Sequence, residues 1–216
     1  MRIFSAGDLL SLLTALQWTL ALTLIALGCG GPLALGLAVM RAGRAALPRW
    51  IAALLLQAVQ GVPLLGLLMF FYFGMPVFLG VDVPALVAVG VAYTIWTAVF
   101  LGEIWRGGIE AVKPAQWEAA ECLGLTKWQQ FRWVIGPQAF RVALPATVGF
   151  LVQLVKNTSL ASIVGFVELA RAGQMASAAT FQPLLTYAVV AAIYFAICFP
   201  LTTWSRSLEA RLNGAR

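Results

Sequence analysis

Five stretches of the chain carry no charged residue and are separated by connections that contain the charged residues. They cover residues 9–40, 50–81, 83–102, 142–155 and 172–205. A helix needs about 20 apolar residues to cross the hydrocarbon core of a bilayer, and all but the fourth stretch reach that length. The fourth stretch becomes a span only if Lys156 lies within it. The pattern therefore predicts an all-α, polytopic membrane protein with about five transmembrane helices in a single domain, residues 1–216.

Composition supports this prediction. Hydrophobic residues make up 62% of the chain and charged residues 10%, whereas soluble domains carry roughly 25% charged residues. Such a chain cannot cover a water-facing surface. The first stretch is longer than the apolar region of a signal peptide, so we expect it to be a retained helix.

Several kinds of chemistry are excluded. The chain contains no histidine, the commonest general base and metal ligand, and no GxxxxGK[ST] phosphate loop. Cys29, Cys122 and Cys198 lack metal-ligand spacing. We therefore expect no catalytic site, no metal and no cofactor bound by this chain. The net charge of +6 is concentrated in particular connections, which indicates membrane topology, so we expect no nucleic-acid partner.

The basic residues predict the orientation of the chain, because cytoplasmic loops are enriched in Lys and Arg. Eleven of the 14 fall in alternate connections, on one side. They are Arg41, Arg44, Arg49, Arg106, Lys113, Lys127, Arg132, Arg141, Arg206, Arg211 and Arg216. This distribution requires an odd number of spans. We expect the N-terminus outside, the C-terminus in the cytoplasm, and external residues around 158–183.

The basic loop between the third and fourth spans contains a predicted helix pair. Residues 115–123 favour a helix, Gly124 suits a left-handed cap, and the sequence from Thr126 to Gln129 fits a capping box. Trp128, Phe131 and Ile135 are spaced to form one apolar face, and Gly136-Pro137 is expected to end the second helix. An exposed apolar helix pair requires a partner protein to bury it.

This loop, residues 112–137, resembles the coupling loop of the permease subunits of ABC importers. The family pattern is EAA, three residues, G, nine residues, then I-x-L-P. The chain keeps the spacing with Glu118-Ala119-Ala120, Gly124 and Val134-Ile135-Gly136-Pro137, while Val134 and Gly136 depart from it. Flanking segments are similar to the polar amino acid permease family over about residues 14–205. They are Pro63-Leu64-Leu65, Tyr72-Phe73-Gly74, Glu103-Ile104, Arg106-Gly107-Gly108-Ile109, Thr158-Ser159-Leu160-Ala161-Ser162, Gly165 and Glu168-Leu169.

The resemblance implies a mechanical role for the loop. Ala119 and Ala120 would let the helix seat closely in a cleft of a cytoplasmic ATPase, Glu118 would anchor it to a basic group, and Gly124 would permit the turn. It also implies the partners: two ATP-binding subunits that hold ATP and Mg²⁺, a second permease subunit, and an extracytoplasmic solute-binding protein. The chain itself would be a non-catalytic, multi-pass subunit in a bacterial inner membrane, in contact with lipid.

Polar residues near the fourth span are the candidates for the solute path. Ionisable groups are costly within a membrane, and Lys156 interrupts this span, with Gln153 and Asn157 close by. Lys156 either meets a solute carboxylate or extends its ammonium group to the outer interface. Glu103, at the inner end of the third span, either contacts solute or forms an ion pair with Arg106 three residues on.

Two departures from the family bear on the solute. The family usually has Arg-Gly-Thr-Pro where this chain has Gln60-Gly61-Val62-Pro63, and Phe150 occupies a position expected to be polar. Either the solute is less charged than usual, or this chain is half of a heterodimer whose partner holds the solute.

Three alternatives remain. The chain is an ion-gradient-driven secondary transporter, a membrane-embedded enzyme, or an ABC permease for a different small polar solute. The secondary transporter and the membrane-embedded enzyme give the cytoplasmic helix pair no function, whereas the third alternative does.

Overall fold

The computed structural model describes residues 3–43 and 45–213. Arg44 and Arg216, which entered the orientation prediction, lie outside these residues. The described chain is helical, and four of its helical runs are long and apolar enough to cross a membrane. A bent pair of helices makes a fifth candidate span. The all-α, five-span prediction is therefore confirmed for this part of the chain.

The first span, α1 (Ala6–Ala42), packs along α4 (Ala85–Glu110), the most buried long helix. At its start, the backbone N–H of Ser5 donates to Asp8 Oδ2 at 2.9 Å, which satisfies an amide that the helix leaves unpaired. At Gly30 the two helices approach so closely that a Cβ atom would lie 2.9 Å from the carbonyl oxygen of Thr94. The glycine-rich segment around Gly30 therefore permits close packing of α1 against α4.

The second stretch is not one straight span. It forms α2 (Ala46–Gln60) and α3 (Leu64–Leu79), whose axes differ by 94° across the break. Proline has no N–H and cannot continue the hydrogen-bond ladder, so Pro63 starts a new helix. The prediction of a single helix over 50–81 was wrong, because Gly61 and Pro63 act together as a breaker.

The fourth span is longer than predicted. It starts with α6 (Lys127–Gln129), continues through the π-helical turn η1 (Gln130–Ile135), and passes without interruption into α7 (Gly136–Asn157). Gly136-Pro137 was expected to end the second helix of the loop. That prediction was wrong, because the helix continues through these residues. The N–H of Gly136 donates to the carbonyl of Phe131, and this wider turn leaves room for the ring of Pro137.

The fifth stretch is divided as well. After the 3₁₀ segment η2 (Thr158–Val164), residues 169–180 form α8 (Leu169–Thr180) and only α9 (Pro183–Asn213) is a long span. The prediction of one helix over 172–205 was wrong at its start. The chain reverses at Phe181, which adopts a left-handed conformation, with Pro183 directly after.

A fully buried carboxylate holds α8 in place. Glu168 caps the helix: its Oε1 accepts from the N–H of Arg171 and its Oε2 from that of Ala170, each at 2.9 Å. The hydroxyl of Tyr194, in α9, also donates to Oε2, at 3.0 Å. Burial raises the pKa of Glu168 above its ordinary value, while these hydrogen bonds oppose the shift. The carboxylate thus joins α8 to α9.

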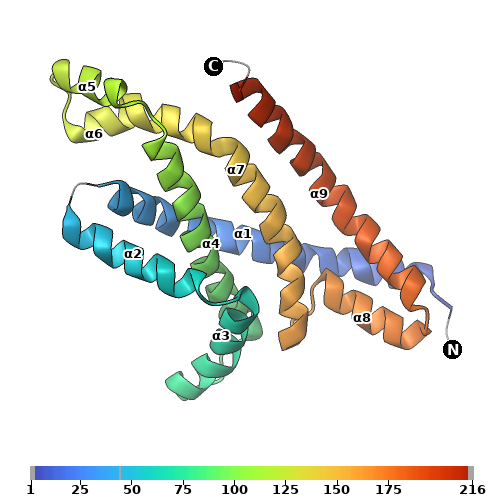
Figure 1. Ribbon diagram of the computed structural model, residues 1–216. Helices are drawn as coiled ribbons and strands as arrows, with labels where there is room; N and C mark the ends of the chain where they lie inside the picture. The colour runs from blue at the N-terminus through green and yellow to red at the C-terminus, as the bar shows by residue number, and fades with distance from the viewer. Residues whose placement is uncertain (1–2, 44, 214–216) are drawn as a thin grey trace.

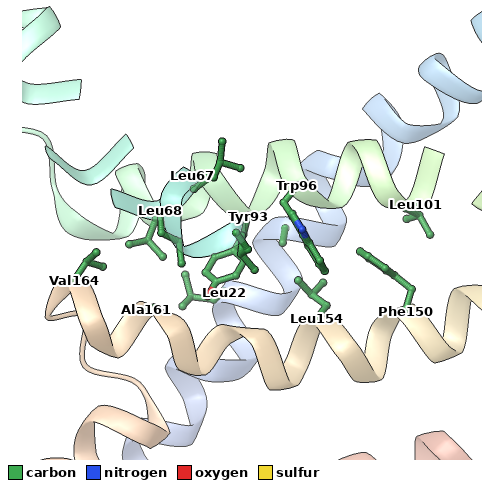
Figure 2. Packing of buried hydrophobic residues seen from close by; sticks show 14 of the residues in the cluster. Leu22, Leu67, Leu68, Tyr93, Trp96, Leu101, Phe150, Leu154, Ala161 and Val164 are labelled. Atoms are coloured by element: carbon green, nitrogen blue, oxygen red, sulfur yellow. The ribbon is translucent and has the colours of Figure 1, made fainter. Parts of the chain in front are cut away.

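The main core lies where α4 crosses α1 and α7 (Figure 2). Tyr93 and Trp96 of α4 face Phe150 and Leu154 of α7, and Leu22 of α1 fills the space beside them. The hydroxyl of Tyr93 donates to the backbone oxygen of Asn157 at 2.6 Å. Figure 1 shows α5 (Pro114–Cys122) and α6 at one end of the molecule, and α8 with the N-terminus at the other.

Candidate functional site

The connection between α4 and α7 is a compact helical hairpin made of α5, α6 and η1. The first helix ends before Gly124, whose φ of 70° lies in the left-handed region that favours glycine. Thr126 caps α6, because its Oγ1 accepts from the N–H of Gln129 at 3.4 Å. In return, the side-chain oxygen of Gln129 accepts from the N–H of Thr126 at 2.9 Å. The predicted turn at Gly124 and the predicted capping box are both confirmed.

The inside of the hairpin is closed by Ala120 and Gln130, each 1% exposed. The side-chain amide of Gln130 donates to the carbonyl of Leu125 at 2.8 Å, which secures the turn. At the rim, the ammonium of Lys127 pairs with Glu121 at 3.0 Å. Ala120 was expected to face a partner together with Ala119, but its small side chain instead lets α5 pack against η1.

The outer surface of the hairpin is unusually apolar. Glu118 and Ala119 are exposed, and so are Leu123, Trp128 and Trp133, whose exposed fractions are 76%, 70% and 75%. The predicted apolar face of Trp128, Phe131 and Ile135 is wrong. Ile135 is buried and Trp128 is not, because the π turn shifts the register between them. The result is a largely apolar surface with two exposed indoles and, at Glu118, an exposed carboxylate.

The hairpin is fixed to the adjacent ends of three long helices, α1, α4 and α7. Trp117 packs against a buried cluster that contains Ala38 of α1, Ile109 of α4 and Ile135 of η1. The amide of Gln138, in α7, donates to Gln116 Oε1 at 3.1 Å. A force applied to α5 is therefore transmitted to α1, α4 and α7 through side-chain packing.

A cavity of about 370 Å³ lies between α2, α4 and α7. This volume falls in the range of small-molecule sites. Its polar lining consists of the amides of Gln60 and Gln153 and the carboxylate of Glu103; the rest is Phe100, Ile104, Ala146 and Phe150. Behind the aromatic wall, Trp96 lies against Phe100 and Phe150, with ring centroids 4.8 and 5.1 Å away (Figure 2 shows Trp96 facing Phe150).

The structure brings together two of the four residues predicted for the solute path. Glu103 and Gln153, 50 positions apart in the sequence, line the same cavity. Lys156 and Asn157 do not line it. Lys156 is exposed near the end of α7, and the backbone oxygen of Asn157 accepts the hydrogen bond from Tyr93.

Glu103 also forms the ion pair expected from its spacing to Arg106. Its Oε1 accepts from Arg106 Nε at 2.8 Å and also from Nη2, while Arg106 Nη1 pairs with Glu110. The second oxygen of Glu103, Oε2, is buried and accepts no hydrogen bond from any described residue. One guanidinium thus serves two carboxylates, and one oxygen of Glu103 stays buried without a hydrogen-bond donor among the described residues.

Five lining residues were not among the predicted site residues. Ala146, Phe150 and Gln153 follow the i, i+4, i+7 spacing of one helix face, so Ala146 could have been placed beside Gln153. Phe100 and Ile104 similarly flank Glu103. Gln60 was noted only as a departure from the family. Its place in the cavity depends on the break after α2, which the sequence analysis missed.

The sequence and the fold of this chain are similar to those of known transport proteins. A family profile described as "binding-protein-dependent transport system inner membrane component" matches residues 30–214. The chain is 34% identical over 194 residues to the probable amino-acid ABC transporter permease protein YckA of Bacillus subtilis (strain 168), covering 90% of this chain and 85% of that protein. It is 33% identical over 199 residues to the L-cystine transport system permease protein TcyB of the same strain, covering 92% and 85%.

Solved structures give the same result. A chain from the crystal structure of an amino acid ABC transporter with histidines matches with a TM-score of 0.86 and 30% identity, covering 98% of this chain and 100% of that one. An inward-facing structure of the MetNI methionine ABC transporter matches with a TM-score of 0.79 over 96% of this chain and 99% of that one. At 21% identity, the second match shows a shared fold alone.

Proposed function

The chain belongs to the family of binding-protein-dependent transport system inner membrane components, and we propose that it forms the path of an ATP-driven amino acid importer in a bacterial inner membrane. It works with two cytoplasmic ATP-binding subunits, a second permease subunit and an extracytoplasmic solute-binding protein. The hairpin α5–α6 docks on the ATP-binding subunits, which hold the ATP and Mg²⁺. The cavity between α2, α4 and α7 is part of the solute path.

The observation that carries this proposal is the exposed surface of the hairpin. Leu123, Trp128 and Trp133 would be costly to leave in water, and they lie on the connection formed by α5, α6 and η1. The docking of this surface on a protein partner removes their apolar area from water. Glu118 and Ala119, exposed on the adjacent helix, supply a charge and a close-packing position for the same partner.

The connection from the hairpin to the cavity supports a mechanical role. ATP binding draws the two ATP-binding subunits together and moves the docked hairpin. Because Trp117 and Gln138 tie the hairpin to the inner ends of α1, α4 and α7, the movement reaches the helices that carry Glu103 and Gln153. A rigid-body change of this kind would open the cavity to one side of the membrane at a time.

The test separates ATP hydrolysis from transport in proteoliposomes that contain the complete complex. Glu118→Lys reverses the charge offered to the ATP-binding subunits, so we expect uptake of a radiolabelled amino acid to fall at least tenfold while ATP hydrolysis persists. Glu209→Lys makes the same charge change at an exposed position of α9, away from the hairpin, and should leave uptake unchanged.

A second variant tests the role of the hairpin without changing any charge. Gly124→Trp forces a large side chain into a left-handed backbone position, which should distort the turn and uncouple the complex. Full uptake by both variants, or uptake by the chain without ATP-binding subunits, would contradict the proposal. The latter result would identify a secondary transporter.

A further inference from the structure

Two pairs of helices meet at the end of the molecule opposite the hairpin, where α8 and the N-terminus lie (Figure 1). One pair is α1 with α4, in close contact at Gly30. The other pair is α8 with α9, where a Cβ atom on Gly173 would lie 2.7 Å from Val190 Cγ2. An apolar cluster and the buried Glu168 lie between the two pairs. A separation of the pairs at this end would therefore expose Glu168 to water.

Glu168 joins the two pairs through hydrogen bonds. Besides capping α8, its Oε2 accepts from the hydroxyl of Tyr194, in α9, at 3.0 Å and from the hydroxyl of Thr19, in α1, at 3.5 Å. The N–H of Leu169 donates in turn to Thr19 Oγ1 at 3.2 Å. Thr19, Glu168 and Leu169 are all fully buried. The release of α8 from α1 requires these contacts to break together.

The charge of this carboxylate is not balanced by a cation among the described residues. Arg171, on the same helix, donates to a glutamine at 2.9 Å, and the ion pairs of the described chain lie elsewhere. The titratable side chains that act on Glu168 from other helices are the phenols of Tyr93, in α4, and Tyr194. α1 presents only the hydroxyl of Thr19, and η2 contains no titratable residue. A phenol is neutral near pH 7, so the ionised carboxylate is costly here.

Both protonation states of Glu168 fit the hydrogen bonds, but only the ionised state places a charge in the interior. A proton on Oε2 has two hydroxyl oxygens within reach, those of Thr19 and Tyr194, while Oε1 still accepts from the N–H of Arg171. Burial raises the pKa of Glu168 above its value in water. The proton therefore binds more tightly while the pairs are in contact, and acid favours that contact.

We propose that Glu168 is a proton-controlled latch: its neutral form holds the pair α8–α9 on the pair α1–α4, and its ionised form releases them, so that uptake follows the pH on this side of the membrane. The inference rests on the proposed function for its effect on uptake, and this side is the expected external one. A separation of the pairs here opens the end of the bundle that receives the solute.

The direction of the pH effect follows from the pKa. The contribution of Glu168 to the contact is complete below the ordinary pKa of a glutamate, about 4.3. It is lost as the pH rises through the raised pKa of the buried carboxyl. Uptake should therefore increase as the external pH rises.

Hydrogen–deuterium exchange of residues 169–180, in the complete complex in nanodiscs, measures the latch without transport. After correction for the intrinsic pH dependence of exchange, we expect protection of this segment to fall at least tenfold from about pH 5 to about pH 9. Glu168→Gln keeps the shape and the hydrogen-bonding capacity of the neutral carboxyl, so α8 should stay protected throughout. Glu209→Gln, the same change at an exposed position of α9, should behave like the wild type.

A tyrosine substitution tests the titration itself. Tyr194→Phe removes a hydrogen bond that lowers the pKa of Glu168, so the midpoint of the loss of protection should move to higher pH. Tyr187→Phe removes a hydroxyl from an exposed position of the same helix and should leave the midpoint in place. A carboxylate that serves only to hold the fold together would give the same midpoint in both variants, which would overturn the latch.

Uptake is measured in proteoliposomes loaded with ATP at constant internal pH, with the solute-binding protein outside. The ratio of wild-type to Glu168→Gln uptake should rise at least threefold as the external pH is raised over the same range, because the binding protein is common to both. Parallel pH profiles of the two chains, in exchange or in uptake, would overturn the latch and leave the proposed function standing. A complex without ATP-driven uptake would overturn the proposed function, while exchange would still show whether Glu168 controls the contact.

Discussion

Gly30 is the residue on which the contact between the two central helices depends. A hydrogen in place of a side chain allows α1 to approach α4 until its backbone nearly touches Thr94 and Thr97. Such small residues let helices pack closely within a membrane, where the hydrophobic effect does not drive their association. Gly28, two positions earlier, has no atom within 4 Å of where its Cβ would lie.

This contrast gives a prediction with an internal control. Gly30→Ala places a methyl group 2.9 Å from a backbone oxygen and from Thr97 Cβ, so we expect a loss of about 1–3 kcal/mol, as in other overpacked sites. Gly28→Ala adds the same methyl group to open space and should be neutral or slightly stabilising. Thermal unfolding of both variants in detergent measures the difference, and equal midpoints would show that the helices are not in contact at Gly30.

Individual site residues were predictable where a local rule decides their place. Gly124 and Thr126 followed from turn and capping chemistry, which involves only a few consecutive residues. The shared cavity of Glu103 and Gln153 depends on how α4 and α7 cross, and no local rule gives this. For the same reason, Ala120 looked like a partner contact in the sequence although it is buried within the hairpin.

The π-helical turn η1 determines which way the hairpin faces. A π turn adds one residue to an α-helix, so it rotates everything before it relative to α7. Gly136 sits where a Cβ atom would lie 2.7 Å from the carbonyl oxygen of Phe131, and it permits the turn. With the extra residue, Trp128 faces outward while Ile135 is buried.

Removing one residue from η1 should therefore turn the hairpin without unfolding it. Deletion of the exposed Arg132 restores the α-helical register and rotates α5 and α6 by about 100° around the helix axis. We expect the complex to lose at least nine-tenths of its ATP-driven uptake while the chain still inserts. Arg132→Ala removes the side chain but keeps the register, and should retain uptake. Normal uptake by the deletion variant would mean that the orientation of the hairpin is unimportant.

At the level of elements, apolar length predicted the spans well and their ends poorly. The stretch 142–155 looked too short because the charged residues Arg141 and Lys156 bound it, whereas α7 contains both. Conversely, 50–81 and 172–205 looked continuous because their composition is uniform. Pro63 and the left-handed Phe181 divide them, but Pro32, Pro76, Pro145 and Pro200 lie inside helices, so proline alone does not mark a break.

At the scale of the whole molecule, the hairpin and α8 lie at opposite ends. This arrangement agrees with the orientation expected from the basic residues, in which the hairpin is cytoplasmic and residues around 158–183 are external. The number of spans followed from apolar length, whereas the side of the membrane stays a prediction from the distribution of charge. The crossing of α1, α4 and α7 that creates the cavity required the three-dimensional fold.

The central claim is that the hairpin faces the cytoplasm and docks there on an ATP-binding subunit. Cys122, exposed at the end of α5, is a natural reporter once Cys29 and Cys198 are replaced by serine. A membrane-impermeant maleimide should label Cys122 in inside-out vesicles and not in right-side-out vesicles, and the bound ATP-binding subunit should protect it. Labelling of Cys122 in right-side-out vesicles would contradict the account.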